Sequence, residues 1–283
     1  MEFKLGTYDL FDVIKIEDQH YILRNSQASL RLAKSAATKP LVIGEKVDVF
    51  IYMNQAKKVV ATMKKPYIDE MTADWVNVVE VKHGLGVFVD VGLDKDMLVS
   101  KDDLPVLKRD WPDVGDQLFC YLRSGKNQII AKPVSRFKMR EYLPVETALS
   151  VDDKVTANVI YLADEGWVLF TKEGHEIFVY YKHSREKYRL GQMIEVTITI
   201  VKDQGHYNGT ALAQKERMLD DDGQRIIDYL NAHQGVMPFT DKSDPNLIQE
   251  TFNMSKAAFK RALGTLYKKQ LVTLEKNQTI LNK

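Results

Sequence analysis

GLGVFVDVGLDKDMLVSKDDLP, residues 84–105, combines a glycine turn with two strand-like runs and is the clearest structural signal in the chain. Residues 76–82 alternate between apolar and other side chains before the turn at 83–86, and residues 87–91 alternate again after it. Gly92 breaks the pattern, and residues 97–99 form a short third run. Alternation with a period of two is typical of strands that bury one face, so this region predicts three consecutive β-strands joined by tight connections.

A second pattern, a glycine followed by alternating apolar positions, occurs three times. The copies are GEKVDVFI at 44–51, GDQLFCYL at 115–122 and GQMIEVTI at 191–198, and their glycines are 71 and 76 residues apart. That spacing is the size of one small barrel. The alternation predicts one buried face in each copy, made by Val47, Val49 and Ile51, by Leu118, Cys120 and Leu122, and by Ile194, Val196 and Ile198.

The strand pattern before each of these copies is also repeated. Gly166 precedes Ile177 by eleven residues, as Gly86 precedes Met97, whereas the first module has strand-like runs at 13–16, 21–23 and 30–32 without the glycine turn. Five short strands in about 65 residues, with a longer connection between the third and fourth, are typical of the OB-fold barrel, which binds oligonucleotides on the face of its second and third strands. We therefore expect a mainly β protein with three five-stranded OB-fold barrels at 1–64, 72–133 and 145–214, separated by proline-marked linkers.

Residues 216–283 change from strand-like to helical spacing and predict a C-terminal α+β module. Asp222, Asp244 and Ser255 are candidate N-caps of three helices, and Pro245 suits the first position of the second helix. The apolar positions of the third helix are Ala258, Phe259, Ala262, Leu263 and Leu266. Strand-like runs at 271–274 and 279–281 follow it. Three helices and a hairpin predict a winged-helix domain with the third helix as its recognition helix.

The composition limits the classes of function. Among the 283 residues, 40 Lys and Arg balance 39 Asp and Glu, so nucleic-acid contact requires local basic patches. A single cysteine, a charged N-terminus and the lack of a long apolar run lead us to expect a cytoplasmic protein without a membrane segment. The six histidines show no metal-ligand spacing, and the phosphate-loop and dinucleotide motifs are incomplete. We expect no enzyme activity, no cofactor and no metal.

Residues 84–105 resemble the RNA-binding repeat of ribosomal protein S-one, in which a G-x-F-V strand carries an aromatic residue that stacks on a base; Phe88 occupies that position. Three such modules followed by a winged helix containing MSKAAFKRALGTLYKKQLV, residues 254–272, resemble the conserved virulence factor B family (YitL-like proteins) of Gram-positive bacteria. The resemblance covers the whole chain. It implies a cytoplasmic RNA-binding protein that affects gene expression after transcription and has no known catalytic centre.

Candidate RNA-binding residues lie in the second and third modules. Phe88 alternates with Val87 and Val89, so it either lies on the open barrel face or fills the core; Lys82 and His83 before the turn are candidate phosphate contacts. In the third module, aromatic and basic residues are interleaved, which suits single-stranded RNA because rings stack on bases and cations hold the backbone. The candidates there are Tyr180, Lys182 and Arg185. Ile22 stands at the Phe88 position of the first module, so we expect RNA affinity mainly in modules two and three.

The predicted third helix of the winged-helix domain is basic. Its candidate nucleic-acid contacts are Lys256, Lys260, Arg261 and Lys268. Spacings of four and eight residues place the three lysines on one side of a helix, away from its apolar face. Such a surface is consistent with contact to nucleic acid, with contact to a protein, or with an ordinary solvated helix face, and the sequence leaves these alternatives open. The sequence therefore favours a non-catalytic protein that binds single-stranded RNA, with a winged-helix DNA-binding regulator and a ribosome- or nuclease-associated scaffold as alternatives.

Overall fold

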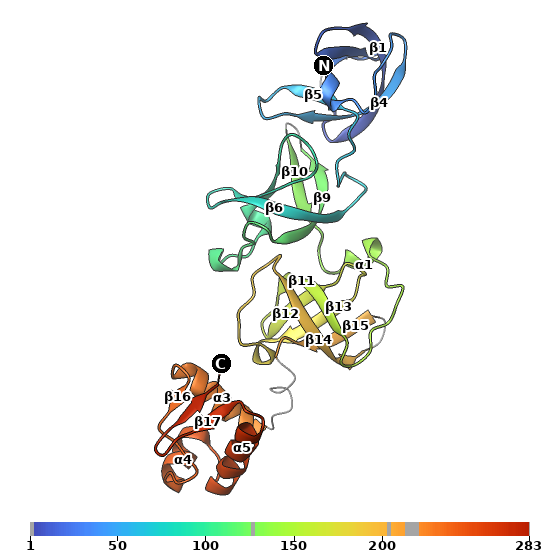
Figure 1. Cartoon of the computed structure of the whole chain (residues 1–283). Helices are drawn as coiled ribbons and strands as arrows, with labels where there is room; N and C mark the ends of the chain where they lie inside the picture. The colour runs from blue at the N-terminus through green and yellow to red at the C-terminus, as the bar shows by residue number, and fades with distance from the viewer. Residues whose placement is uncertain (1–2, 126–127, 203–204, 213–220, 283) are drawn as a thin grey trace. The chain divides into compact units, whose positions relative to one another are not determined.

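The computed structural model describes residues 3–125, 128–202, 205–212 and 221–282, and its first module is a closed five-stranded barrel (Figure 1). The strands are β1 (Thr7–Ile16), β2 (His20–Arg24), β3 (Ser29–Ala33), β4 (Lys46–Met53) and β5 (Val59–Thr62), in the order β1-β2-β3-β5-β4. Strands β3 and β5 are parallel, and the other neighbours are antiparallel. This strand order is that of an OB-fold, which confirms the predicted fold of the first module.

The second and third modules repeat this architecture. The second contains β6 (Asp74–Lys82), β7 (Gly86–Val89), β8 (Met97–Ser100), β9 (Gln117–Ser124) and β10 (Ile129–Pro133) in a sheet of order β10-β9-β6-β7-β8. The third contains β11 (Lys154–Leu162), β12 (Gly166–Phe170), β13 (Glu176–Tyr180), β14 (Met193–Val201) and β15 (His206–Thr210) in a closed barrel of order β11-β12-β13-β15-β14. A single-turn helix, α1 (Met139–Tyr142), lies in the linker between these two modules. The predicted mainly β class with three tandem OB-folds is confirmed.

The interior faces of the strands contain the residues that alternation predicts. All nine apolar residues expected to face inward on β4, β9 and β14 are buried. Gly86 and Gly166 start the second strands of their modules, and a Cβ atom built on them would lie 2.0 Å from the Val99 carbonyl oxygen and 2.2 Å from that of Val179. Since any side chain would collide with the neighbouring strand, the shared register of the two modules depends on glycine at both positions.

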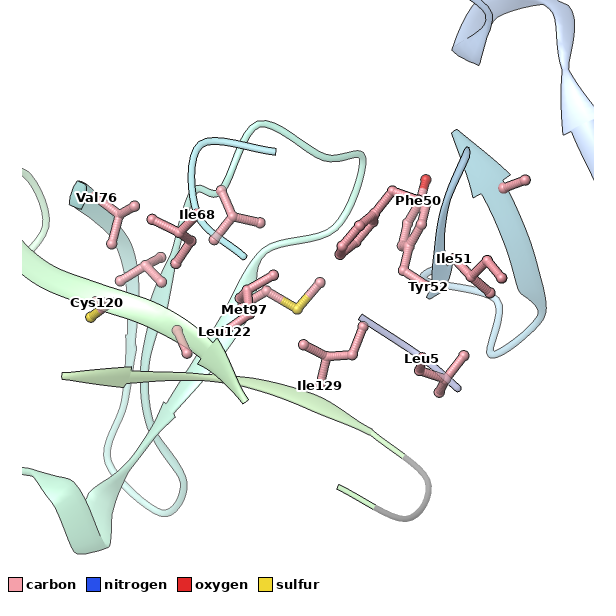
Figure 2. Packing of buried hydrophobic residues seen from close by; sticks show 14 of the residues in the cluster. Leu5, Phe50, Ile51, Tyr52, Ile68, Val76, Met97, Cys120, Leu122 and Ile129 are labelled. Atoms are coloured by element: carbon pink, nitrogen blue, oxygen red, sulfur yellow. The ribbon is translucent and has the colours of Figure 1, made fainter. Parts of the chain in front are cut away.

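The first and second modules share one apolar cluster, which covers the outer side of β4. Phe50 and Tyr52 alternate with the interior residues of that strand, yet their exposed fractions are only 0% and 4%. Figure 2 shows both rings on the side of β4 that faces Met97 and Ile129 of the second module. The Tyr52 hydroxyl also donates a hydrogen bond to Asp94 Oδ1 at 2.7 Å. The first module therefore uses one outer face for contact with the second.

Direct hydrogen bonds join the second module to the third. Gln117 N donates to the Gly191 carbonyl oxygen at 3.0 Å. The Arg189 guanidinium donates from Nε and Nη2 to the two carboxylate oxygens of Asp116, at 2.7 and 3.1 Å. Asp116 is buried, while the side chain of Arg189 is 35% exposed, so this bidentate pair connects the two modules at a partly exposed junction.

The C-terminal unit, residues 212–283, contains the helices and strands of a winged-helix domain. Its elements are α3 (Asp221–Ala232), β16 (Val236–Met237), α4 (Pro245–Phe252), α5 (Lys256–Lys268), β17 (Val272–Leu274) and β18 (Thr279–Leu281). Asp244 and Ser255 cap α4 and α5 as predicted, by accepting hydrogen bonds from Asn246 N and Ala258 N. The prediction that Asp222 caps the first helix is wrong, because α3 already begins at Asp221. The expected boundary between the third barrel and this domain, at 214–216, lies outside the described residues.

Among the described residues, no helix combines the length and the apolar character that crossing a membrane requires.

Candidate nucleic-acid interface

Phe88 lies on the outer face of the second barrel. It belongs to β7, where Val87 and Val89 on either side are fully buried while Phe88 is only partly buried. Its cross-strand neighbours are Glu80 on β6 and Leu98 on β8. The core alternative for Phe88 is therefore wrong: the ring stands on the face of the second and third strands, where OB-folds bind oligonucleotides.

The surroundings of Phe88 combine basic and acidic groups. Lys82 and His83 are exposed at the end of the β6–β7 hairpin, and the His83 ring centroid lies 6.2 Å from that of Trp111. On the other side, burial raises the pKa of Asp96, and the negative charges of Asp90 and Glu80 raise it further. This face therefore offers the Phe88 ring for stacking. Because the carboxylates near the ring repel phosphate, a nucleic-acid backbone is attracted only to the hairpin end at Lys82 and His83.

Tyr180 and Lys182 of the third barrel lie together at the end of β13. The Lys182 ammonium is 5.6 Å from the Tyr180 ring centroid, and the ring of Phe178 stands edge-on to Tyr180 at 4.7 Å. Both rings are partly exposed. His183 completes this group with its ring centroid 5.6 Å from that of Tyr180. Arg185 is exposed in the loop that follows.

His183 stays neutral at a pH at which an exposed histidine begins to take up a proton. Burial lowers the pKa of its imidazole, the adjacent Lys182 ammonium lowers it further, and the Gly209 backbone opposes both. In this group Lys182, rather than His183, therefore supplies the positive charge near neutral pH.

The face of the third barrel is partly closed by the chain itself. Val168 occupies the position in β12 that Phe88 has in β7, and its exposed fraction is 1%. Val134 and Met139 of the preceding linker pack in one cluster with Val168 and Phe170. Aromatic residues of this module consequently divide into buried ones, such as Phe170, and the exposed group around Tyr180.

A groove on the first barrel was missed by the sequence reasoning. It has a volume of about 1090 Å³ and lies over β2, β3 and β5, with the loop at Gly92–Asp94 of the second module at its rim. Its basic lining residues are Lys15, His20, Arg31, Lys58 and Lys64, and its acidic ones are Glu17 and Asp94.

The charges of this groove favour an anion. Lys15 hydrogen-bonds Glu17 at 2.9 Å and lowers the pKa of that carboxyl, as do the more distant Arg31 and His20. Within the described part of the chain, Arg31, Lys58 and Lys64 make no salt bridge. Three cations thus remain available to a ligand beside apolar residues of the barrel face, an arrangement suited to a nucleic-acid backbone.

The basic residues of the winged-helix domain differ in exposure. Lys260, Arg261 and Lys268 are exposed on α5, whereas Lys256 is partly buried in its first turn. Arg261 Nη2 lies 3.8 Å from Asp222 Oδ2. The opposite side of the helix is buried as predicted, with Phe259, Ala262, Leu263 and Leu266 in the domain core. Lys260 and Lys268 are thus placed on the solvent side of the helix, whereas the expected exposed stripe does not extend fully to Lys256.

Within the residues that the structure describes, His, Cys, Asp and Glu side chains do not gather in any group of three or more that could hold a metal ion. Cys120 is buried in the second barrel, and burial raises the pKa of its thiol far above the usual range. It is therefore a packing residue rather than a nucleophile.

Comparisons with known proteins agree with this architecture. Family models match for a CvfB-like winged helix domain at 224–281, a CvfB first S1-like domain at 73–132 and an S1 domain at 5–64. The chain is 35% identical to conserved virulence factor B of Staphylococcus epidermidis, over 99% of this chain and 95% of that protein. It is 36% identical to the uncharacterized protein YitL of Bacillus subtilis, over 93% and 88%.

A solved structure is also similar over nearly the full length. It is the crystal structure of a multidomain protein with nucleic acid binding domains from Streptococcus pneumoniae, with 29% identity, a TM-score of 0.69 and 99% coverage of both chains. The S1-like and winged-helix domain types are nucleic-acid-binding modules rather than catalytic families, so the domain content gives this chain a nucleic-acid-binding role.

Proposed function

This chain belongs to the conserved virulence factor B family, and from that premise we propose that it is a non-catalytic protein that holds single-stranded RNA on its barrels and regulates gene expression after transcription. The observation that carries the proposal is the basic groove of the first barrel, defined by Arg31, Lys58 and Lys64. It lies over the second and third strands of an OB-fold, where a single strand is held by its backbone while its bases remain accessible.

Exposed rings on the other two barrels complete the proposed RNA surface. Phe88 and Tyr180 stand on outer faces, each with a lysine nearby, Lys82 at the hairpin end and Lys182 above the Tyr180 ring. Rings stack on any base, and unpaired bases are accessible only in single strands. This combination supports single-stranded RNA as the ligand class and argues against duplex readout by the barrels.

The experiment compares three nucleic acids with the full-length protein. Fluorescein-labelled single-stranded RNA, single-stranded DNA and duplex DNA of 20 nucleotides or base pairs are titrated at two salt concentrations, because the salt dependence counts phosphate contacts. We expect the tightest binding to single-stranded RNA. Tighter binding to duplex DNA at both salt concentrations would overturn the proposal.

A winged-helix DNA-binding regulator is the second candidate, and the exposed cations of α5 favour it. If it is correct, Lys260→Glu with Lys268→Glu abolishes duplex DNA binding and leaves single-stranded RNA binding unchanged, since the two surfaces are on different domains. A third candidate, a ribosome- or nuclease-associated scaffold, predicts weak binding to all three nucleic acids.

A further inference from the structure

The linker between the second and third barrels covers part of the outer surface of the third barrel. Val134 and Met139 are buried and pack with Val168 and Phe170, which stand on the outer side of β12. The face that would otherwise bind an oligonucleotide is therefore occupied by residues 134–143 at this point. Whatever touches this side of the third barrel must contact the linker.

Phe137 points away from that packed layer. Although it lies between two buried residues of the linker, 84% of its surface is exposed. A phenylalanine this exposed contributes little to folding, and the barrel below it is already covered by Val134 and Met139. Its ring is thus available to a ligand.

Arg136 joins this ring to the third barrel. Its guanidinium carbon lies 5.3 Å from the ring centroid of Phe137 and 5.8 Å from that of Tyr161 on β11. Arg136 Nη2 also donates to Glu176 Oε1 at 3.2 Å, which anchors the guanidinium on β13. Tyr161 is about half exposed, at 49%. Two accessible rings and one planar cation are therefore held together before any ligand binds.

A cavity lies beside these three side chains. Its volume is about 320 Å³, and Phe119 and Leu190 contribute to its lining together with Arg136, Phe137 and Tyr161. This is near the lower limit of about 300 Å³ for small-ligand pockets, so it suits one planar group rather than a helix or a folded surface. Exposed Lys138 follows directly in the chain and adds a positive charge at the edge.

We propose that Phe137, Arg136 and Tyr161 form a stacking site for one unpaired base of the single-stranded RNA, a site that rests on the function proposed above. Aromatic rings and arginine planes are the groups on which proteins stack unpaired bases, and Lys138 is placed to contact a neighbouring phosphate. The linker thereby restores a base-binding surface where it covers the one on β12. The site lies outside the face of any single barrel.

The test uses the full chain and a fluorescein-labelled 20-nucleotide single-stranded RNA containing all four bases. Phe137→Leu removes the ring but keeps an apolar side chain, and it should weaken binding about 5- to 20-fold without changing the salt slope. Phe137→Tyr retains the ring and should stay within about 2-fold of the original protein. Met71→Leu is the control, because Met71 is 85% exposed and does not line the cavity.

A second readout detects contact directly. Phe137→Trp adds a fourth indole to the three of the original protein. When the same RNA is added, the variant should lose more tryptophan fluorescence than the original protein does, since stacking on a base quenches the indole. Unchanged RNA affinity in Phe137→Leu, or no greater loss of fluorescence than in the original protein at saturating RNA, overturns the stacking site and leaves the RNA-binding function standing. If the original protein fails to bind the RNA at all, both the site and the proposed function are rejected.

Discussion

Replacing Arg31 and Lys58 by Ala should weaken single-stranded RNA binding in a way that depends strongly on salt. Both side chains line the groove of the first barrel, and neither makes a salt bridge within the described residues, so each is available to one phosphate. For single strands, the logarithm of affinity falls with the logarithm of salt concentration by about 0.7 per neutralised phosphate. Losing two contacts should therefore reduce the slope by about 1.4.

The same relation sets the loss of affinity. Each contact is worth about 4-fold at 0.15 M salt, so the double variant should bind about 14-fold more weakly there, about 65-fold more weakly at 0.05 M, and equally well near 1 M. Fluorescence anisotropy with a labelled 20-nucleotide single-stranded RNA at four salt concentrations measures both quantities. The control with the same change in charge is Lys39→Ala with Lys46→Ala, two exposed lysines of the same barrel outside the groove, of which Lys39 pairs with Glu45. It should leave the slope unchanged.

A result in which the Arg31 and Lys58 double variant keeps the original slope refutes the assignment of the groove as a phosphate track. The expectation from sequence places RNA affinity mainly in the second and third modules, and the Tyr180 variant described next tests it. Both variants should melt at the temperature of the original protein, because the four side chains lie outside the apolar cores. Full-length protein is required, since a fragment ending at residue 64 would expose Phe50 and Tyr52.

Three further outcomes are expected. Tyr180→Ala should weaken single-stranded RNA binding about 5- to 20-fold with an unchanged salt slope, measured by the same titration; an unaffected affinity in the folded variant would exclude its ring from the RNA surface. Gly86→Ala should lower the free energy of unfolding by about 2–4 kcal/mol in denaturant melts, because its Cβ would collide with the Val99 carbonyl, whereas Gly84→Ala, with open space around it, should change little. The pKa of His183 is lowered in the folded protein, so the unfolded chain binds the proton more readily, and the free energy of unfolding should decline as pH falls below the ordinary histidine pKa of 6.5. His183→Gln should reduce this decline in denaturant melts over a range of pH. The same pH profile in the variant and the original protein would contradict the prediction.

Much of the fold follows from local patterns, because the constraints that define each barrel lie close together in the chain. Gly86 and Gly166 must be glycine to clear the neighbouring strand, and each fixes a register that reappears eleven residues later at Met97 and Ile177. The caps at Asp244 and Ser255 are equally local. Burial of Phe50 and Tyr52 on the outward side of β4 is different, since it depends on contact with another module.

The candidate binding residues also divide into those that local sequence indicates and those that only the folded chain brings together. Phe88 was a candidate because it alternates with Val87 and Val89, a relation within three residues, but only the structure shows that its ring stands outside the barrel. The groove cations Arg31, Lys58 and Lys64 come from separate segments, and no local pattern joins them. Only the folded arrangement of β2, β3 and β5 brings their charges to one surface, which is why sequence reasoning did not find the groove.

The covering of β12 shows why a repeated sequence does not give a repeated binding surface. Val168 has the same register as Phe88, but residues of the preceding linker bury it, so the two modules present different faces from the same fold. An apolar residue at the outward position of a strand is therefore as consistent with a covered face as with a binding face. In the folded chain, the linker that covers β12 also exposes the ring of Phe137. The stacking site proposed above would therefore place base contact of the third module on the linker instead of on β12.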